Sequence, residues 1–401
     1  MRYFPAVLIA LILLTGCAGQ KVFTSNGVSY FSQPARELTA CYKFTNAPVP
    51  GAEISTVPLA GKPLSLEQMI YFPVETNYLT GKERQAFTTV YAIDQTNKAV
   101  RDSLVLKQDG KRASYRHLAF NKDLYLVGIQ DTLLHIIRVD KTLKIQNEYN
   151  PGLRFIYLAD VSVYDGRLRV VGSSPENDII MYDIKTDTMQ PERKRLLVRN
   201  FDHYDMDGNI LWYFSADEKN LTTARMDLTA FDPTPVYKTF ELAIPKLAGY
   251  QVYNTKAAGN TIFLSWSWFT DDAKGASKLV AIEYDNGKIA AKEVEGNITF
   301  DVQNTNSKTY MFRTALLNKK QALMLTEIKP DLTESAPAVT FFLAEQEFAR
   351  GIQAYGKDGF ILTGAFNQKT GKKILQDMGT GKPVKVDEAF PQPFLSIFSL
   401  E

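Results

Sequence analysis

The sequence has 401 residues, of which 45% are hydrophobic and 22% are charged. This composition supplies a sizeable apolar core and excludes a chain that is disordered throughout. The formal net charge of +2 lacks the basic excess of most nucleic-acid-binding domains, so no nucleic-acid partner is expected.

The N-terminus has the layout of a bacterial secretion signal. Arg2 precedes an apolar stretch of about ten residues, Phe4 to Leu14, which is shorter than the roughly 20 residues of a membrane-spanning helix. The stretch closes with Leu14-Thr15-Gly16-Cys17, which resembles the lipobox of bacterial lipoproteins. The resemblance implies that the chain is cut before Cys17 and that this cysteine carries lipid. The alternative is an ordinary secretory signal in which Cys17 stands by chance.

The residue after the cysteine bears on the destination of such a lipoprotein. Lipoproteins retained in the inner membrane of enteric-type bacteria often carry Asp there, whereas this chain has Ala18. The resemblance therefore predicts lipid anchoring in the outer membrane, on its periplasmic face. Two or more acyl chains hold a protein firmly on a membrane.

The second cysteine has no obvious partner. The sequence contains only Cys17 and Cys41, so lipidation of Cys17 leaves Cys41 without an intramolecular disulfide. We expect Cys41 to be a small buried hydrophobic residue. An intermolecular disulfide or a reactive thiol is the alternative.

From about residue 65 onward, short strands alternate with turns, and helical periodicity is almost absent. An early unit covers Met69–Val74, Phe87–Asp94 and Leu104–Leu106. Six clearer units follow, in each of which a turn precedes a strongly apolar strand and a second strand comes next. The six pairs are Leu124–Gly128 with Leu134–Asp140, Arg167–Gly172 with Ile179–Ile184, Ile210–Phe214 with Thr223–Leu228, Thr261–Trp268 with Leu279–Tyr284, Tyr310–Phe312 with Ala322–Ile328, and Phe360–Gly364 with Ile374-Leu375.

The spacing of these units predicts a repeat fold. The units recur every roughly 42–52 residues, which is typical of four-stranded propeller blades. Asp-Gly and Gly-Asn pairs stand where a tight hairpin needs positive φ. We predict an all-β protein with a β-propeller of about seven four-stranded blades, with six or eight blades as alternatives and a pair of β-sandwiches as the rival fold. To close the ring, Phe394–Leu400 and Val28–Ser32 are both apolar enough.

The predicted organisation is a signal peptide over residues 1–16, a lipidated tether over 17–26 and a single propeller domain over 27–401. In size, anchor and repeat the chain resembles the class of bacterial propeller lipoproteins, which includes the outer-membrane assembly propeller that works beside the β-barrel insertion machine. The tryptophan-docking signature of quinoprotein propellers is not visible, since the only tryptophans are Trp212, Trp266 and Trp268. The Trp-Asp and Gly-His pairs of WD40 repeats are also missing.

Three histidines limit the acid–base chemistry that can be proposed. His135 stands in the apolar run LLHIIRV, where we expect a structural histidine. His117 is expected on an inner strand near the axial channel, in a structural role or facing the channel. The third, His203, belongs to a segment with alternating acidic residues.

That segment, residues 202–209, offers the candidate metal ligands Asp205 and Asp207. Closely spaced acidic residues before a glycine are similar to a Ca²⁺ loop. The EF-hand register would, however, place Phe214 where a bidentate Glu is needed, so we expect a plain turn. Trp266 and Trp268 share one face of a strand, which fits either a buried core or a platform for carbohydrate or peptide.

No nucleophile elbow, P-loop, dinucleotide fingerprint, haem-attachment motif or HExxH zinc motif is present, and no cofactor is predicted. The resulting hypothesis is a membrane-anchored periplasmic lipoprotein whose propeller is a non-catalytic binding or scaffolding module for an envelope protein or polymer. One alternative is a propeller enzyme, either a glycan hydrolase or lyase or a quinone-type dehydrogenase, with its site at the axial channel. Another is a surface-displayed adhesin or receptor.

Overall fold

The structure is a computed structural model, and its described residues are interrupted by gaps. They are 21–25, 28–32, 37–43, 53–54, 59–80, 83–97, 99–108, 113–199, 202–216, 220–242, 252–269, 275–295, 300–305, 308–317, 320–335, 339–342, 347–356, 359–377 and 383–399. The predicted signal peptide and the predicted lipidation site, Cys17, lie outside these residues. The side chains of Cys41, Trp266 and Trp268 lie outside the described part as well.

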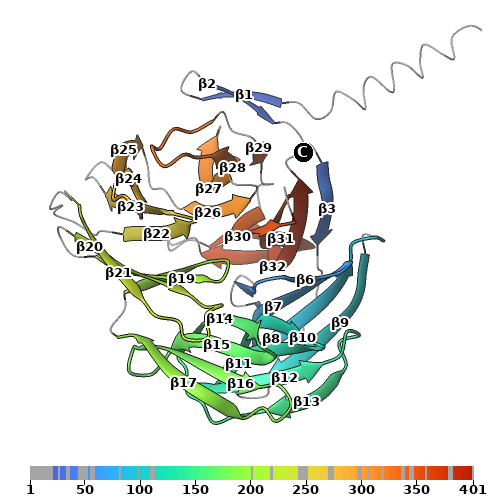
Figure 1. Ribbon diagram of the computed structural model, residues 1–401. Helices are drawn as coiled ribbons and strands as arrows, with labels where there is room; N and C mark the ends of the chain where they lie inside the picture. Colours follow the sequence, from blue (N-terminus) through green and yellow to red (C-terminus); the bar gives the residue numbers. More distant parts are fainter. Residues whose placement is uncertain are drawn as a thin grey trace, which may run out of the picture. The chain divides into compact units, whose positions relative to one another are not determined.

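The described strands form a seven-bladed β-propeller of antiparallel sheets (Figure 1). Five of the sheets each contain four strands that follow one another in the chain. Their first strands are β10 (Ala113–Asn121), β14 (Tyr157–Tyr164), β18 (His203–Asp207), β22 (Val252–Ala258) and β26 (Phe300–Thr305). Their second strands are β11 (Asp123–Gln130), β15 (Arg167–Ser173), β19 (Ile210–Ala216), β23 (Thr261–Phe269) and β27 (Lys308–Leu317). Their third strands are β12 (Leu133–Val139), β16 (Ile179–Lys185), β20 (Asn220–Asp227), β24 (Gly275–Glu283) and β28 (Lys320–Glu327). Their fourth strands are β13 (Ile145–Tyr149), β17 (Pro191–Val198), β21 (Val236–Glu241), β25 (Ile289–Glu295) and β29 (Val339–Phe342).

The first sheet of the chain is less regular. Its long strand β7 (Met69–Thr80) pairs on one side with three short strands and on the other with β8 (Glu83–Asp94), which pairs with β9 (Ala99–Gln108). The short strands are β4 (Glu53–Ile54), β5 (Leu59–Ala60) and β6 (Leu64–Leu66). Three separate pieces therefore take the place of one first strand.

The seventh sheet joins the two ends of the chain. Its order is β3-β32-β31-β30, in which β3 (Glu37–Lys43) comes from the N-terminal part. The other strands are β30 (Glu347–Tyr355), β31 (Gly359–Asp377) and β32 (Pro383–Ser399). The predicted C-terminal closing segment falls mainly in β32.

Two predicted strands were placed wrongly. Val28–Ser32 does not close the ring, because it is β2, which pairs with β1 (Lys21–Ser25) across a two-residue connection and so forms a local hairpin. Ile374-Leu375 is not a separate strand, because β31 runs without interruption through Asp377. Strand β1 lies within the predicted tether.

The chain divides into two compact units. One comprises residues 1–41, 249–362 and 396–401, and the other comprises residues 42–248 and 363–395. In the second unit, buried side chains of consecutive sheets pack into shared apolar clusters, such as Val127 and Ile136 with Val170 and Ile180. In the first unit, Phe263 and Leu279 pack with Val302 and Met311 in the same manner. Burial between facing sheets therefore supplies the core of each unit.

Burial explains why the second and third strands were visible in the sequence. In β15, six of the seven residues are buried, whereas in β13 four of the five are exposed. The expected turns are also present, since Asp165 and Gly166 have φ of 46° and 72°, and Gly208 has φ of 59°. In the described part of the chain no helix has the length and apolarity needed to cross a membrane.

Candidate functional site

The first strands of neighbouring sheets lie side by side in the unit that contains residues 42–248. Strand β10 contacts β14, and β14 contacts β18. The connection between β5 and β6 packs against β10, where the Lys62 N–H donates a hydrogen bond of 3.2 Å to the Arg116 carbonyl. Seven side chains from these elements form what we call the Arg116 cluster: Lys62, Glu75, Ser114, Arg116, His117, Tyr157 and Asp160.

A β-bulge places Arg116. Tyr115 pairs with Gly128 and His117 pairs with Val127, so Arg116 is an extra residue with no partner on β11. Such a bulge bends the strand and redirects a side chain. Gly128 makes the bulge possible, because a Cβ at this position would lie 2.2 Å from the Ser114 carbonyl oxygen.

The neighbouring first strand, β14, also has a bulge. In β14 the register shifts between Leu158, which pairs with Gly172, and Asp160, which pairs with Val171. A Cβ on Gly172 would lie 2.3 Å from the Tyr157 carbonyl oxygen. Adjacent first strands thus each have a bulge opposite a glycine, and both bulges adjoin residues of the Arg116 cluster.

Arg116 is held at one edge of its guanidinium. Its Nε donates to Ser114 Oγ at 3.1 Å, and Ser114 Oγ donates to Glu75 Oε2 at 2.6 Å. Its Cζ lies 5.9 Å from the centroid of the Tyr157 ring. Within the described part of the chain no hydrogen-bond acceptor is paired with the two Nη groups of Arg116. The outer end of the guanidinium is therefore open to an acceptor from outside.

Lys62 and Asp160 form an ion pair between different sheets. The Lys62 Nζ lies 3.7 Å from Asp160 Oδ1, and the Lys62 side chain is 54% exposed whereas that of Asp160 is 9% exposed. Burial raises the pKa of Asp160, and the charge of Lys62 acts against this rise. The pair balances a carboxylate that would otherwise be poorly solvated.

His117 is neutral at physiological pH. Burial, together with the positive charges of Arg116 and Lys62, lowers the pKa of His117 to about 4. A hydrogen bond to the Leu158 backbone holds the ring. His117 lies on a first strand, as predicted, and it adds an uncharged imidazole to the cluster.

The other two histidines lie in different surroundings. The Nδ1 of His135 is 2.6 Å from the Tyr115 hydroxyl, and its Nε2 is 3.8 Å from Glu148 Oε2. This confirms the expected structural histidine. His203 is exposed at the start of β18.

The segment with Asp205 and Asp207 is one side of a β-hairpin. Both residues belong to β18 and pair with Trp212 and Ile210 of β19, and Gly208 makes the turn. Among the described residues, no group of three or more His, Cys, Asp or Glu side chains is arranged to hold a metal ion. Turn formation accounts for the spacing of the acidic residues.

The three tryptophans lie on second strands of two sheets, β19 and β23. Trp212 is fully buried and stacks on Phe214, with ring centroids 6.4 Å apart. Trp266 and Trp268 lie on β23, where they pair with Lys278 and Ala276 of β24.

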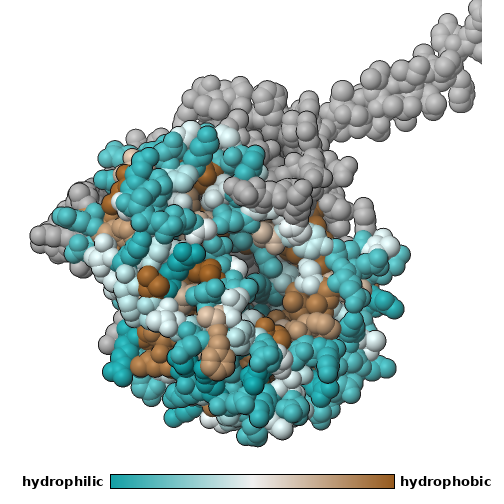
Figure 2. Space-filling view, in the orientation of Figure 1, coloured by the Kyte–Doolittle hydropathy of each residue, from teal (hydrophilic) through white to brown (hydrophobic). Residues whose placement is uncertain are grey.

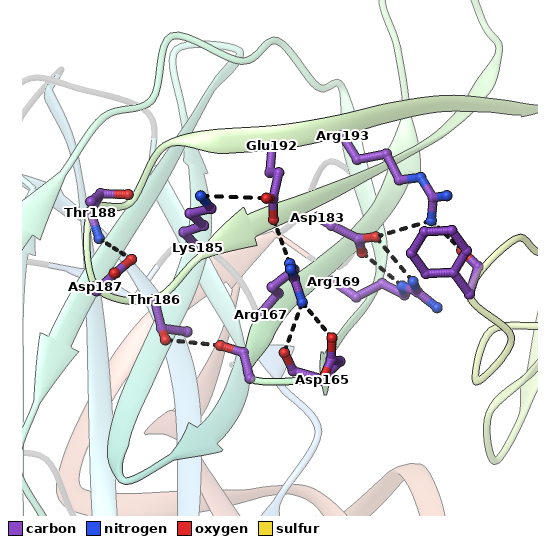
Figure 3. A network of polar contacts seen from close by, with 12 residues as sticks. Asp165, Arg167, Arg169, Asp183, Lys185, Thr186, Asp187, Thr188, Glu192 and Arg193 are labelled. Carbon is purple, nitrogen blue, oxygen red and sulfur yellow. Dashed lines mark hydrogen bonds and ion pairs between the residues drawn. The ribbon is translucent and has the colours of Figure 1, made fainter.

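A second polar network lies around Arg169, whose side chain is buried together with that of Asp183 (Figure 3). The Arg169 side chain is 0% exposed and forms two hydrogen bonds with Asp183, of 2.8 and 3.0 Å. It also donates to the carbonyls of Leu228 and Ala230, which follow β20 in the next sheet. All of its charge is therefore used inside the protein, in contrast to Arg116.

The exposed apolar side chains of the described residues are scattered on the face seen in Figure 2. In the view of Figure 2, hydrophilic side chains cover most of the described surface and hydrophobic ones form separate small patches. Among the residues whose side chains the structure describes, the most exposed large hydrophobic one is Phe231, at 67%, and its ring lies 3.8 Å from Arg193 Cζ. Scattered apolar residues of this kind are normal on soluble surfaces.

The comparisons with known proteins give similarity in fold. No family model matches the sequence, and no curated protein matches it. The chain is similar to the WD40 domain of SCAP from fission yeast, with 8% identity and a TM-score of 0.40 over 88% of this chain and 99% of that chain. It is similar to BamB from Moraxella catarrhalis, with 10% identity and a TM-score of 0.40 over 79% of this chain and 94% of that chain. It is also similar to an acylaminoacyl peptidase from Pyrococcus horikoshii, with 9% identity and a TM-score of 0.43 over 82% of this chain, but it spans only 52% of the peptidase.

Sequence reasoning found one member of the cluster and missed most of its partners. His117 was named as a candidate, whereas Lys62, Glu75, Tyr157 and Asp160 were not. These residues are separated by many positions in the chain and meet only because the first strands pack together. The available signal was a Val-Gly pair near the end of each of β11 and β15, since both glycines face a bulge.

Proposed function

We propose that the protein is a lipoprotein of the bacterial envelope, anchored through lipid on Cys17, whose propeller is a non-catalytic binding or scaffolding module. The observation that carries the proposal is the Arg116 cluster. It presents the open guanidinium end of Arg116 on strand β10, and the half-exposed ammonium of Lys62 on the connection between β5 and β6 that packs against this strand. Rigid strands hold binding groups more precisely than loops do.

The anchor is tested by Cys17→Ala. The variant is expected to leave the membrane fraction, because the lipid would be the attachment. The measurement is the distribution of the protein between soluble and sedimenting envelope fractions. A variant that still sediments with membranes would contradict the anchor.

The binding function is tested by purifying the lipidated protein from its own membranes in mild detergent. A stoichiometric envelope protein or polymer is expected with the wild type and at a reduced amount with Arg116→Gln. The matched control is Arg199→Gln, which removes the charge of an exposed arginine outside the cluster. A wild-type protein that reproducibly retains nothing would contradict the scaffold role.

One observation favours a second candidate, an enzyme acting on glycans. The cluster brings a neutral histidine, two carboxylates and two cations together from three sheets, which is the kind of convergence a propeller active site needs. Its carboxylates already have protein partners, however, since Glu75 accepts from Ser114 and Asp160 pairs with Lys62. Release of reducing ends from envelope glycans by wild type, and its loss in His117→Asn, would establish the enzyme.

A further inference from the structure

We infer that the Arg116 cluster binds a carboxylate side chain of an acidic polypeptide segment, beside the ring of Tyr157. The inference rests on the proposed binding function and names the chemistry of the partner. It depends on three features of the cluster: the free end of Arg116, the charge balance, and the aromatic surface next to the guanidinium.

The free end of Arg116 selects the ligand geometry. Because Nε is occupied by Ser114 Oγ at 3.1 Å, the two Nη groups remain as a parallel pair of donors. A planar carboxylate matches such a pair with two parallel hydrogen bonds. The Ser114–Glu75 chain fixes the guanidinium before the ligand arrives, which reduces the entropy lost on binding.

The charge balance selects one negative charge. Lys62 and Arg116 are opposed by Glu75 and Asp160, and His117 is neutral. A cluster whose charges already balance accommodates a single carboxylate more readily than a doubly charged phosphate. It also gives little long-range attraction, so contact and hydrogen bonding would decide the affinity.

The aromatic surface favours a polypeptide. Tyr157 is 42% exposed, its ring centroid lies 5.9 Å from Arg116 Cζ, and it is 5.7 Å from the ring of Tyr204 on the next first strand. Ile156 beside it is 58% exposed. Arginine and tyrosine next to exposed apolar surface are the residue types that dominate protein–protein contacts.

The test uses the three histidines as reporters in the full-length protein. Selective ¹³C labelling of histidine gives signals from His117, His135 and His203, of which His117 adjoins Arg116 in the chain. The probe is the capped peptide acetyl-Leu-Asp-Leu-amide, compared with its Asn analogue. We expect saturable shifts of the His117 signal with the Asp peptide, at about tenfold lower concentration than with the Asn peptide, because a charged acceptor forms the stronger hydrogen bond.

Variants separate this site from general effects. Arg116→Gln is expected to weaken binding of the Asp peptide about tenfold and that of the Asn peptide less, so that the two peptides bind nearly alike. Arg199→Gln should bind as the wild type does. Equal responses to both peptides, no response to either, or a stronger response to glucuronate or inorganic phosphate would each overturn the inference. If the Arg116→Gln variant retains the partner as well as the wild type does, this inference is wrong, whereas the proposed scaffold function still stands.

Discussion

Arg169 occupies a position that other sheets fill with an aromatic residue. It is the third residue of β15 and pairs with Asp183, whereas the third residues of β11 and β19 are Tyr125, opposite Arg138, and Trp212, opposite Arg225. In each case a cation meets a ring or a carboxylate across the strands. In β15 the cation lies on the second strand of the sheet and is fully buried. Its positive charge therefore needs the counter-charge of Asp183.

Removing that compensation should be costly. We expect Asp183→Asn to lower the free energy of unfolding by about 3–5 kcal/mol, because it leaves a buried guanidinium without its counter-charge. Urea unfolding measures the loss. The control is Glu327→Gln, which breaks the more exposed pair with Lys308 and should cost less than about 1 kcal/mol.

A double variant tests whether the ion pair is the cause. Arg169→Met with Asp183→Leu removes both charges of the pair and should recover more than half of the loss, because no buried charge is then left without its partner. Failure to recover would assign the energy to the hydrogen bonds that Arg169 donates to Leu228 and Ala230.

His117 should make stability depend on pH in the mildly acidic range. Its folded pKa of about 4 lies below the ordinary value of 6.5, so the unfolded chain binds the proton first as pH falls. Stability is therefore lost between about pH 6.5 and pH 4, by up to about 3 kcal/mol. The raised pKa of Asp160 acts in the opposite sense, because protonation relieves its burial.

The comparison with His117→Asn isolates the histidine from Asp160, Lys62 and Arg116. Unfolding midpoints of the two proteins, measured from pH 7 to pH 4.5, should converge as pH falls, because only the wild type carries this histidine's cost. Parallel curves would show that His117 does not have the lowered pKa.

At the scale of the strand, the bulges depend on glycine. Gly128→Ala should destabilise the protein by about 2 kcal/mol or more, because its Cβ would meet backbone atoms of Ser114 at 2.2 Å and the strand must shift. Gly152→Ala is the control: its φ is +73° but a Cβ there meets nothing within 4 Å, so only backbone strain of about 1–2 kcal/mol remains. Thermal unfolding measures both variants, and equal losses would mean that the close approach is relieved without cost.

The sequence predicted the strands that are buried and missed those that are not. Apolar second and third strands such as β15 and β16 were found, with their turns, because burial on both faces demands continuous apolar runs. The outer strand β17 reads PERKRLLV and half of its residues are exposed, so no hydrophobic pattern identifies it. The divided first strand β4–β6 was missed for a related reason, since pieces of two or three residues have no periodicity.

The candidate site was predictable in one residue only. His117 could be assigned to a first strand, because the apolar strand that follows is recognisable. The partnership of Lys62 with Asp160 joins residues of different sheets, and the exposure of Arg116 comes from a one-residue bulge. Neither depends on local pattern, since both follow from packing between sheets.

At the scale of the whole molecule, the seventh sheet has a special place. Five sheets are made of strands that follow one another in the chain, whereas the seventh pairs β3 with β32 and so joins its two ends. The N-terminal strand β3 covers the edge of β32, which would otherwise be unpaired. The fold as a unit should therefore depend on the backbone hydrogen bonds of β3.

Two adjacent proline substitutions test this dependence. In an antiparallel edge strand, consecutive N–H groups point alternately toward the partner and away from it, so proline removes a ladder bond at only one of two neighbouring positions. Thr39→Pro and Ala40→Pro should accordingly differ: one should lower the unfolding midpoint by several degrees, and the other should stay within about two degrees of the wild type. Differential scanning calorimetry of the two full-length variants measures the difference. If both are tolerated, β3 does not hold the ends together. If both are equally damaging, the loss comes from the proline ring and not from a ladder hydrogen bond. N-methylation of the same two amides in a semisynthetic chain then removes the pairing of β3 without a proline ring and decides whether β3 closes the fold.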